Sequence, residues 1–155
     1  MDPKAKGNKN IPIAHSGADW GIHHQWDWNG YKCHWRFIGD INHQAIVLIH
    51  GFGASSAHWR NNAKDFANEG FCVYGLDLVG FGKSEQPEKN KTKYLDNHCW
   101  SNQLESFLEE IVLLNKSDKA ILIGNSLGGL VALTSITFRP DLVKAIIAAP
   151  LPDPA

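Results

Sequence analysis

The sequence has no excess of charge of either sign and no long apolar run. Its 155 residues carry a formal net charge of −1, with 43% hydrophobic and 20% charged residues. A nearly neutral chain lacks the basic surface that attracts nucleic acids or anionic membranes. No stretch approaches the roughly 20 apolar residues of a membrane-spanning helix. We therefore predict one soluble globular domain with neither a nucleic-acid partner nor a membrane span.

Cysteine is scarce, and the histidines lack the spacing of metal ligands. The three cysteines, Cys33, Cys72 and Cys99, form no C-x-x-C pair, which predicts reduced thiols in the cytoplasm. None of the eight histidines lies in an H-x-x-x-H or H-E-x-x-H pattern, so we expect no metal and no cofactor. Residues 1–19 are polar and without the apolar core of a secretory signal, and we expect a disordered leader there, followed by a core domain over residues 20–155.

Apolar segments alternate with helix-forming segments along the core. Asn29-Gly30 between two aromatic-rich runs predicts a β-hairpin, because this pair tolerates the positive φ angles of a type I′ turn. Four later apolar runs predict buried strands: Ala45–Ile49, Phe71–Leu76, Ala120–Ile123 and Val143–Ala148. The fold class is therefore α/β, a mostly parallel sheet of about six strands with an N-terminal antiparallel hairpin and helices on both faces.

Three helices are expected between these strands. Residues 56–68 form the first, with Ser55 or Ser56 as the N-cap and Gly70 as the stop. The second begins at Asp96 or Asn97 and runs to about Asn115. Its buried face is predicted from the apolar spacing to comprise Trp100, Leu104, Phe107, Leu108, Ile111 and Leu114. The third runs from Gly128 to about Phe138 and ends before Pro140.

A G-x-S-x-G pentapeptide, residues 124–128, lies between the third of these apolar runs and the helix that follows. In a strand–turn–helix context this motif places a serine at the apex of a sharp turn, with glycines where side chains would collide with neighbouring backbone. Ser126 is therefore a candidate nucleophile. His50-Gly51-Phe52-Gly53 and Asp77 follow two other predicted strands, and ligands of parallel sheets bind beyond these carboxyl ends.

Taken in this order, these motifs make the chain resemble the N-terminal part of an α/β-hydrolase over about residues 20–154. The segment from Gly124 to Pro140 most resembles the pheophytinase-like and chlorophyllase-like serine hydrolases of photosynthetic organisms. Haloalkane dehalogenases and epoxide hydrolases resemble the chain from His50 to Arg60, but they use a carboxylate where Ser126 stands. The resemblance thus implies a serine hydrolase that acts on an ester or related carbonyl compound.

The resemblance also implies a role for each matched residue. Ser126 would be the nucleophile, and the backbone N–H groups of Phe52 and Leu127 would form the oxyanion hole. Asp77 would be structural, and Asp153 is a possible acid of the triad. The residues expected to support the loops are His50, Gly51, Gly53, Gly124 and Gly128.

The family places its catalytic histidine late in the chain, whereas no histidine follows His98. We therefore expect an incomplete fold that ends where a lid would begin, with impaired activity. A non-catalytic scaffold that binds partners is the alternative, and self-association through the exposed edge strand at Val143–Ala148 is expected. A nucleotide-binding domain is a weaker alternative, because Gly51-Phe52-Gly53 starts a dinucleotide fingerprint whose third glycine is replaced by Ser56.

Overall fold

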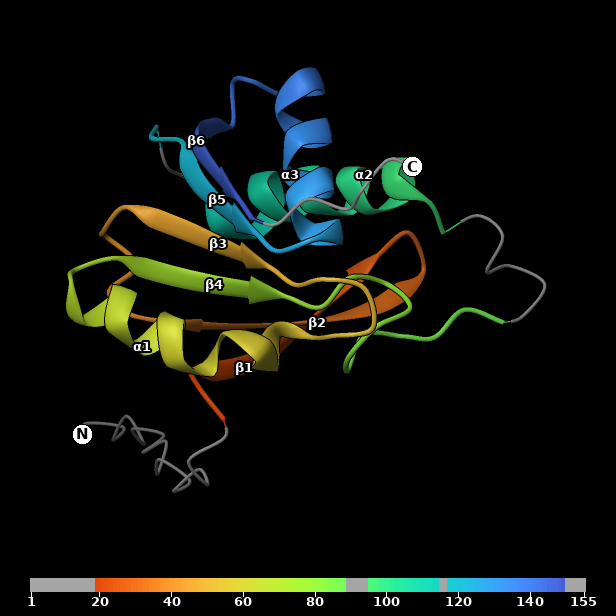
Figure 1. The fold of residues 1–155 in the computed structure, drawn as a ribbon, viewed down its shortest axis with the longest axis horizontal. Helices are drawn as coiled ribbons and strands as arrows, with labels where there is room; N and C mark the ends of the chain where they lie inside the picture. The colour runs from red at the N-terminus through yellow and green to blue at the C-terminus, as the bar shows by residue number, and fades with distance from the viewer. Residues whose placement is uncertain (1–18, 89–94, 115–116, 150–155) are drawn as a thin grey trace, which may run out of the picture.

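A computed structural model describes residues 19–88, 95–114 and 117–149. Its centre is a six-stranded sheet in the order β1-β2-β4-β3-β5-β6 (Figure 1). The strands are β1 (Ile22–Trp28), β2 (Tyr31–Ile38), β3 (Ala45–Ile49), β4 (Cys72–Leu76), β5 (Ala120–Gly124) and β6 (Val143–Ala148). β1, β2 and β4 pair antiparallel, and β4, β3, β5 and β6 pair parallel. The predicted mixed α/β sheet is confirmed.

The hairpin has the predicted turn. Asn29 and Gly30 both have positive φ, 47° and 82°, and Trp28 pairs with Tyr31 across the two-residue loop. Positive φ at both central positions is the mark of a type I′ turn, whose twist matches that of the flanking strands.

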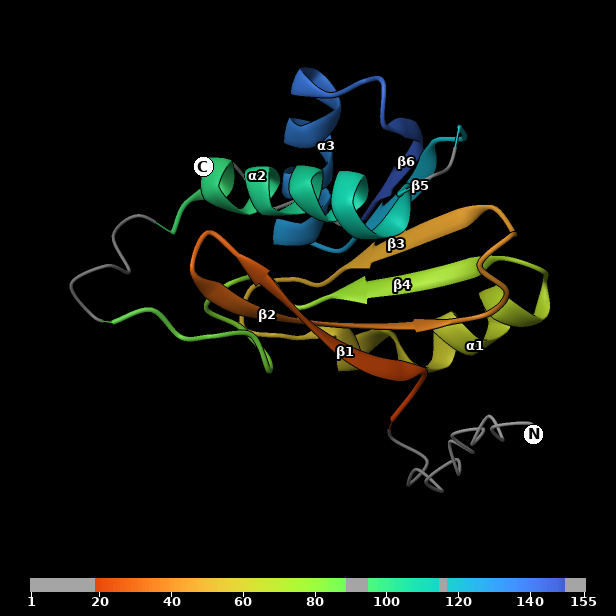
Figure 2. The ribbon, with the colours of Figure 1, turned by 180° about the vertical axis from the view of Figure 1, so that it is seen from behind.

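Helices cover both faces of the sheet, as Figures 1 and 2 show. The 3-10 helix η1 (Ser56–Trp59) and α1 (Arg60–Asn68) lie on one face, where Trp59 and Ala63 pack on β3 and β4. α2 (Asn97–Phe107), the π-helix η3 (Leu108–Val112) and α3 (Leu127–Phe138) lie on the other. An apolar core therefore lies on each face of the buried strands, and a third, smaller cluster contains Trp28, Cys33 and Val79.

The first helix begins at the predicted N-cap. Ser55 is that residue and is extended, but its side chain makes no capping hydrogen bond. The Ser56 N–H instead donates to the Asp77 carboxylate at 2.6 Å, which is a cap supplied by the tertiary structure. The predicted stop is confirmed: Gly70 has φ 85°, and the Phe71 N–H donates to the Phe66 carbonyl as in a Schellman motif.

The second helix has the predicted cap but a different end. The Asp96 side chain accepts a hydrogen bond from the Cys99 N–H at 2.8 Å. After Phe107 the helix widens into η3, and the wider turn changes which residues face the sheet. Val112 and Leu113 are buried, whereas Leu114 is 59% exposed, so the prediction was wrong for Leu114.

The strand β6 is at the edge of the described sheet, as predicted, but it is not buried. Only Val143 is fully buried, and Ile147 is 56% exposed, because no described strand lies beyond β6. The expectation of a buried strand is therefore wrong for most of its length.

Two expectations fall on residues that lie outside the described ranges. These are Asp153 as an acid and the leader, of which only Asp19 is described. Asp19 accepts a hydrogen bond from the Trp20 N–H and forms an ion pair with Arg36. Within the described ranges, no helix is both long and apolar enough to cross a membrane.

Candidate functional site

Three parallel strands, β3, β4 and β5, end at the same edge of the sheet, and the sequence motifs follow them there (Figure 1). His50-Gly51-Phe52-Gly53 follows β3, Asp77 follows β4, and Ser126 follows β5. Loops at the carboxyl ends of parallel strands converge on one region, which is where α/β sheets bind ligands.

Ser126 lies at a strained turn between β5 and α3. Its φ and ψ are 54° and −118°, a conformation that a residue with a side chain rarely adopts. The turn is held because the Asn125 N–H donates to the Ile49 carbonyl and the Gly129 N–H donates to the Ser126 carbonyl. Ser126 as a residue is half-buried, so part of it is open to solvent.

The flanking glycines permit close backbone approach. A Cβ on Gly128 would lie 2.6 Å from the Ile49 carbonyl carbon and 2.7 Å from the His50 oxygen. A Cβ on Gly124 would strike the backbone of Gly128. Backbone atoms cannot give way as a flexible side chain can, so both positions require glycine.

The loop after β3 lies directly beside Ser126. A Cβ built on Gly51 would be 3.4 Å from the Ser126 Cβ and 3.3 Å from the Asn125 carbonyl oxygen. Gly53 has φ 70°, which turns the chain after Phe52. Phe52 comes directly after Gly51, and Leu127 comes directly after Ser126. The two backbone N–H groups predicted to form the oxyanion hole therefore belong to the segments on either side of the serine. The Phe52 N–H has no hydrogen-bond acceptor within the described part of the chain, and Leu127, as the first residue of α3, has no intrahelical acceptor.

His50 is fully buried and connects two loops. Its Nε2 accepts a hydrogen bond from the Leu78 N–H at 3.1 Å, so its proton is on Nδ1, which donates to the Gly51 carbonyl at 2.8 Å. Burial lowers the pKa of His50 and outweighs the opposing effects of Gly51 and Asp77. With both ring nitrogens occupied and the ring kept neutral, His50 has no nitrogen left to accept a proton from Ser126.

Asp77 is the centre of a buried hydrogen-bond network. Its carboxylate accepts from the Ser56 N–H, from the Lys83 N–H at 2.9 Å and from His34 Nδ1 at 2.9 Å. Burial opposes ionisation of Asp77, but these hydrogen bonds outweigh it and hold its pKa well below the ordinary range. Gly82, at φ 57°, packs its backbone against this carboxylate. Asp77 therefore fixes the loops around the site.

Two side chains of this network were not predicted from the sequence. His34 on β2 contacts the Asp77 carboxylate, and the Gln103 side chain on α2 accepts from the Val79 N–H and donates to the Asp77 carbonyl. Both are fully or nearly fully buried. The only signal in the sequence is that His34 and Gln103 are polar residues among neighbours that predict burial. That signal does not identify Asp77 as their partner, because Asp77 is 43 positions from His34 and 26 from Gln103.

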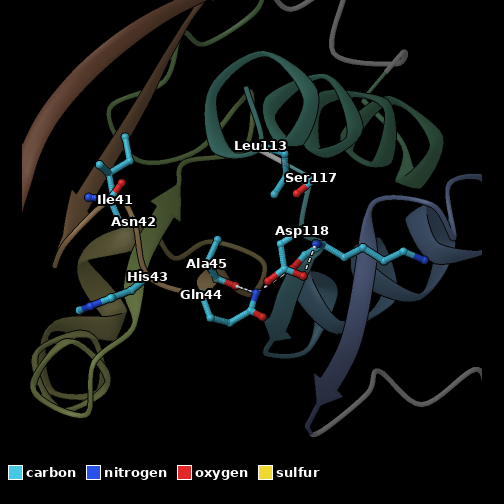
Figure 3. Close-up of a pocket in the computed structure, with 9 residues that line it drawn as sticks. Ile41, Asn42, His43, Gln44, Ala45, Leu113, Ser117 and Asp118 are labelled. Carbon is cyan, nitrogen blue, oxygen red and sulfur yellow. Dashed lines mark hydrogen bonds between the residues drawn. The ribbon is translucent and has the colours of Figure 1, made fainter. Parts of the chain in front are cut away.

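A pocket of about 280 Å³ lies at the amino ends of the parallel strands, opposite to the carboxyl ends where Ser126 lies (Figure 3). Its walls come from residues 41–45 before and at the start of β3, from Leu113, and from residues 117–119 before β5. The Gln44 side chain joins two walls of this pocket, because its Nε2 donates a hydrogen bond to the Lys119 carbonyl at 2.7 Å. Because it is at the amino ends of the strands, this pocket is not part of the site around Ser126.

Trp59 and Trp100 are buried, and His58 and His98 are exposed on the surface. Among the described residues, no histidine is hydrogen-bonded to the Ser126 hydroxyl, and no cluster of histidine, cysteine and carboxylate side chains could hold a metal ion.

Comparison with known proteins agrees with this geometry. Residues 44–153 match the family described as alpha/beta hydrolase fold. The chain is 27% identical over 127 residues to epoxide hydrolase 4 of Mus musculus, covering 82% of this chain and 33% of that protein. It is 29% identical over 126 residues to the AB hydrolase superfamily protein YfhM of Bacillus subtilis (strain 168), covering 81% and 42%.

A solved structure shows the same fold. The thioesterase domain from the curacin biosynthetic pathway superposes with a TM-score of 0.80 at 23% identity, covering 88% of this chain and 48% of that one. The chain thus spans between a third and a half of the proteins it matches here. The family match extends over most of the sequence, and the chain belongs to the α/β-hydrolase fold family.

Proposed function

We propose that this chain carries the nucleophile and the oxyanion hole of a serine hydrolase that acts on an ester or a related carbonyl compound. One observation carries the proposal: Ser126 occupies a strained turn between β5 and α3 with the backbone of Gly51 packed beside it. Attack on a carbonyl requires this arrangement, because the hydroxyl must reach the carbonyl carbon while the N–H groups donate to the oxygen of the same carbonyl.

The chemistry follows from these positions. The Ser126 oxygen attacks the carbonyl carbon while its proton passes to a base from outside the described residues, and the Phe52 and Leu127 N–H groups donate to the negative oxygen that forms. The oxyanion then collapses and expels the alcohol, which takes up the proton and leaves an acyl group on Ser126. The N-terminus of α3 adds the positive end of its helix dipole. Phe52 is 76% exposed, and the centroid of its ring is 5.2 Å from that of Phe81. The two rings give a substrate with a bulky apolar part a surface to pack on.

A serine at this turn favours acyl transfer over epoxide opening. Several matched proteins are named epoxide hydrolases, and enzymes of that class use a carboxylate at the corresponding turn, where this chain has Ser126. A carboxylate forms an ester intermediate with an alkyl carbon, whereas a serine needs a carbonyl to attack. The narrower resemblance to pheophytinase-like and chlorophyllase-like enzymes stays a prediction.

The described residues provide no base for Ser126, since His50 is fully engaged. Without a base a serine hydroxyl is a weak nucleophile, and loss of one triad member costs several orders of magnitude in rate. The same observation favours a second candidate, a non-catalytic scaffold that keeps the fold and uses its surface to bind partners. Asp153 as an acid and the cytoplasmic location also stay predictions.

Labelling with a fluorophosphonate probe distinguishes the two candidates. We expect the wild-type chain to be labelled slowly at Ser126, and added imidazole to accelerate the labelling by at least about tenfold, because imidazole supplies the missing base. The Ser126→Ala variant should show no labelling at that site. Mass spectrometry of the labelled peptide gives the position, and the rate is followed by in-gel fluorescence.

The matched control is Ser117→Ala, which removes a serine near the opposite edge of the sheet and should label at the wild-type rate. Equal labelling of wild type and Ser126→Ala, or none with imidazole, would leave the scaffold as the remaining candidate.

The edge strand β6 is also proposed to bind a second copy of this chain. Ile147 is 56% exposed on a strand that has no neighbour on its outer side among the described residues, and an apolar edge strand is a template for pairing. We expect Ile147→Lys to raise the concentration at which the chain associates by about tenfold, since it places a charge where apolar contact would form. Sedimentation velocity over a concentration series measures this. Ile22→Lys at the other edge is the control, and an equal effect there would contradict the choice of β6.

A further inference from the structure

Trp20 lies in a notch between β4 and η1. It is 1% exposed, although it comes just two residues before the first strand. The floor of the notch is Gly75 on β4, where a Cβ would lie 2.7 Å from Trp20 Cζ2 and 2.8 Å from Trp20 Cη2. The same Cβ would be 3.1 Å from the Ser56 Cβ on η1. Glycine at this position of β4 therefore makes room for the indole ring.

Arg36 holds Trp20 from the neighbouring strand. It pairs with Gly75 across β2 and β4, and residues directly opposite each other lie on the same face of a sheet. The guanidinium carbon of Arg36 is 5.3 Å from the centroid of the Trp20 ring, which is a cation–π contact. Its Nη1 also donates to the Trp20 carbonyl at 3.4 Å. The ring and the backbone of Trp20 are thus both fixed in a buried site.

The indole N–H of Trp20 binds the start of η1. Trp20 Nε1 donates to the Ser56 carbonyl at 2.9 Å, and this hydrogen bond is buried. The Ser56 N–H donates to the Asp77 carboxylate at 2.6 Å. The two peptide groups on either side of the Ser56 Cα are therefore held by two side chains, one from the segment before β1 and one from the end of β4. Neither peptide group can rotate without breaking a buried hydrogen bond.

Ser56 ends the loop that carries the Phe52 N–H. The loop begins with a turn in which the Ala54 N–H donates to the Gly51 carbonyl at 3.2 Å and Gly53 has φ 70°. A single residue separates this turn from Ser56. The loop is fixed by β3 at one end and by Ser56 at the other, so a movement of Ser56 displaces Phe52.

We propose that Trp20 is a positioning residue, which holds the Phe52 N–H beside Ser126 by fixing Ser56. Trp20 touches no reacting atom and acts through the Ser56 carbonyl. The value of this position for catalysis rests on the proposed function, whereas the order of the loop does not.

Trp20→Phe and Trp59→Phe form a matched pair of variants. Trp20→Phe keeps an aromatic ring in the notch and removes the donor to Ser56. Trp59 lies on η1 in the same apolar core as Trp20, and its Nε1 has no hydrogen-bond partner among the described residues. Both variants lose the same atoms, so the difference between them reports the hydrogen bond to Ser56.

Amide hydrogen exchange followed by NMR is the first measurement, with the amides of β5 as the internal reference for global unfolding. In Trp20→Phe, we expect exchange of the Ala54 and Ser56 amides to rise at least about tenfold relative to that reference. Trp59→Phe should leave the ratio within about twofold of the wild type. An unchanged ratio in Trp20→Phe, or an equal rise in both variants, would overturn the proposal.

Gly75→Ala tests the same contact while Trp20 keeps its indole. The added Cβ would meet the ring, and the ring must tilt out of the notch and give up its hydrogen bond to Ser56. We expect the same local rise in exchange as in Trp20→Phe. Wild-type exchange in this variant would show that the notch does not hold the loop.

Fluorophosphonate labelling of Ser126 with added imidazole is the second measurement. We expect Trp20→Phe to be labelled at least about fivefold more slowly than the wild type, because a misplaced donor stabilises the oxyanion less well. Trp59→Phe should be labelled at the wild-type rate. Faster exchange without slower labelling would contradict a positioning role. If the wild type is not labelled at all, the proposed function fails, and hydrogen exchange alone decides whether Trp20 fixes the loop.

Discussion

The Gly128→Ala variant is expected to lose about 3 kcal/mol or more of its free energy of unfolding. The added Cβ would lie within 2.7 Å of backbone atoms of Ile49 and His50. Relief requires α3 to move away from β3, which opens the apolar core beneath them. Val131 and Ala132, both fully buried on α3, would lose their contacts in the process. Urea denaturation followed by far-UV circular dichroism measures the loss.

Thr137→Ala is the matched control on the same helix, because Thr137 is exposed and alanine favours helix. It should change the free energy of unfolding by no more than about 0.5 kcal/mol. If Gly128→Ala were equally mild, the close approach of α3 to β3 would be contradicted, and with it the position of Ser126 beside the loop after β3.

The Asp77→Asn variant is expected to lose about 3 kcal/mol of stability at neutral pH. An amide keeps one oxygen that can accept from the Ser56 N–H, but its NH₂ group then faces the donors of Lys83 and His34. The Lys83 N–H and His34 Nδ1 thus lose their acceptor. Urea denaturation at about pH 7 measures the effect, and Asp65→Asn, an exposed carboxylate on α1, should be nearly neutral.

The same pair of proteins has a defined pH dependence. Because folding lowers the pKa of Asp77, its contribution is fully present above the ordinary pKa of 3.8 and is lost as the pH falls toward the folded value. The stability difference between wild type and Asp77→Asn should therefore be constant above about pH 5 and should shrink toward about pH 2. A difference that grew on acidification would contradict an ionised Asp77.

Local signals in the sequence were sufficient for the hairpin turn, for the start of α2 and for the stop of α1. Asn29-Gly30, Asp96 and Gly70 act through their own backbone or that of residues a few positions away. Such interactions are determined by short stretches of chain, so a single sequence reveals them. The elbow around Ser126 belongs to the same class, since its glycines, the strand before it and the helix after it are contiguous.

Other features depended on residues distant in the sequence. The N–H at the start of η1 is capped by Asp77, 21 positions later, and not by the nearby Ser55. The widening of α2 into η3 buries Val112 and Leu113 and exposes Leu114, which helical spacing does not predict. The exposure of Ile147 follows from its place at the edge of the described sheet, which depends on the order of the strands.

The α/β alternation, the family and the place of Ser126 at a sharp turn could all be predicted from the sequence, because apolar periodicity and short glycine motifs are local. Only the folded structure shows which nitrogen of His50 carries the proton and why Asp77 stays ionised. These depend on distances between strands that are paired only in the folded sheet, and on the loss of water around charges buried there.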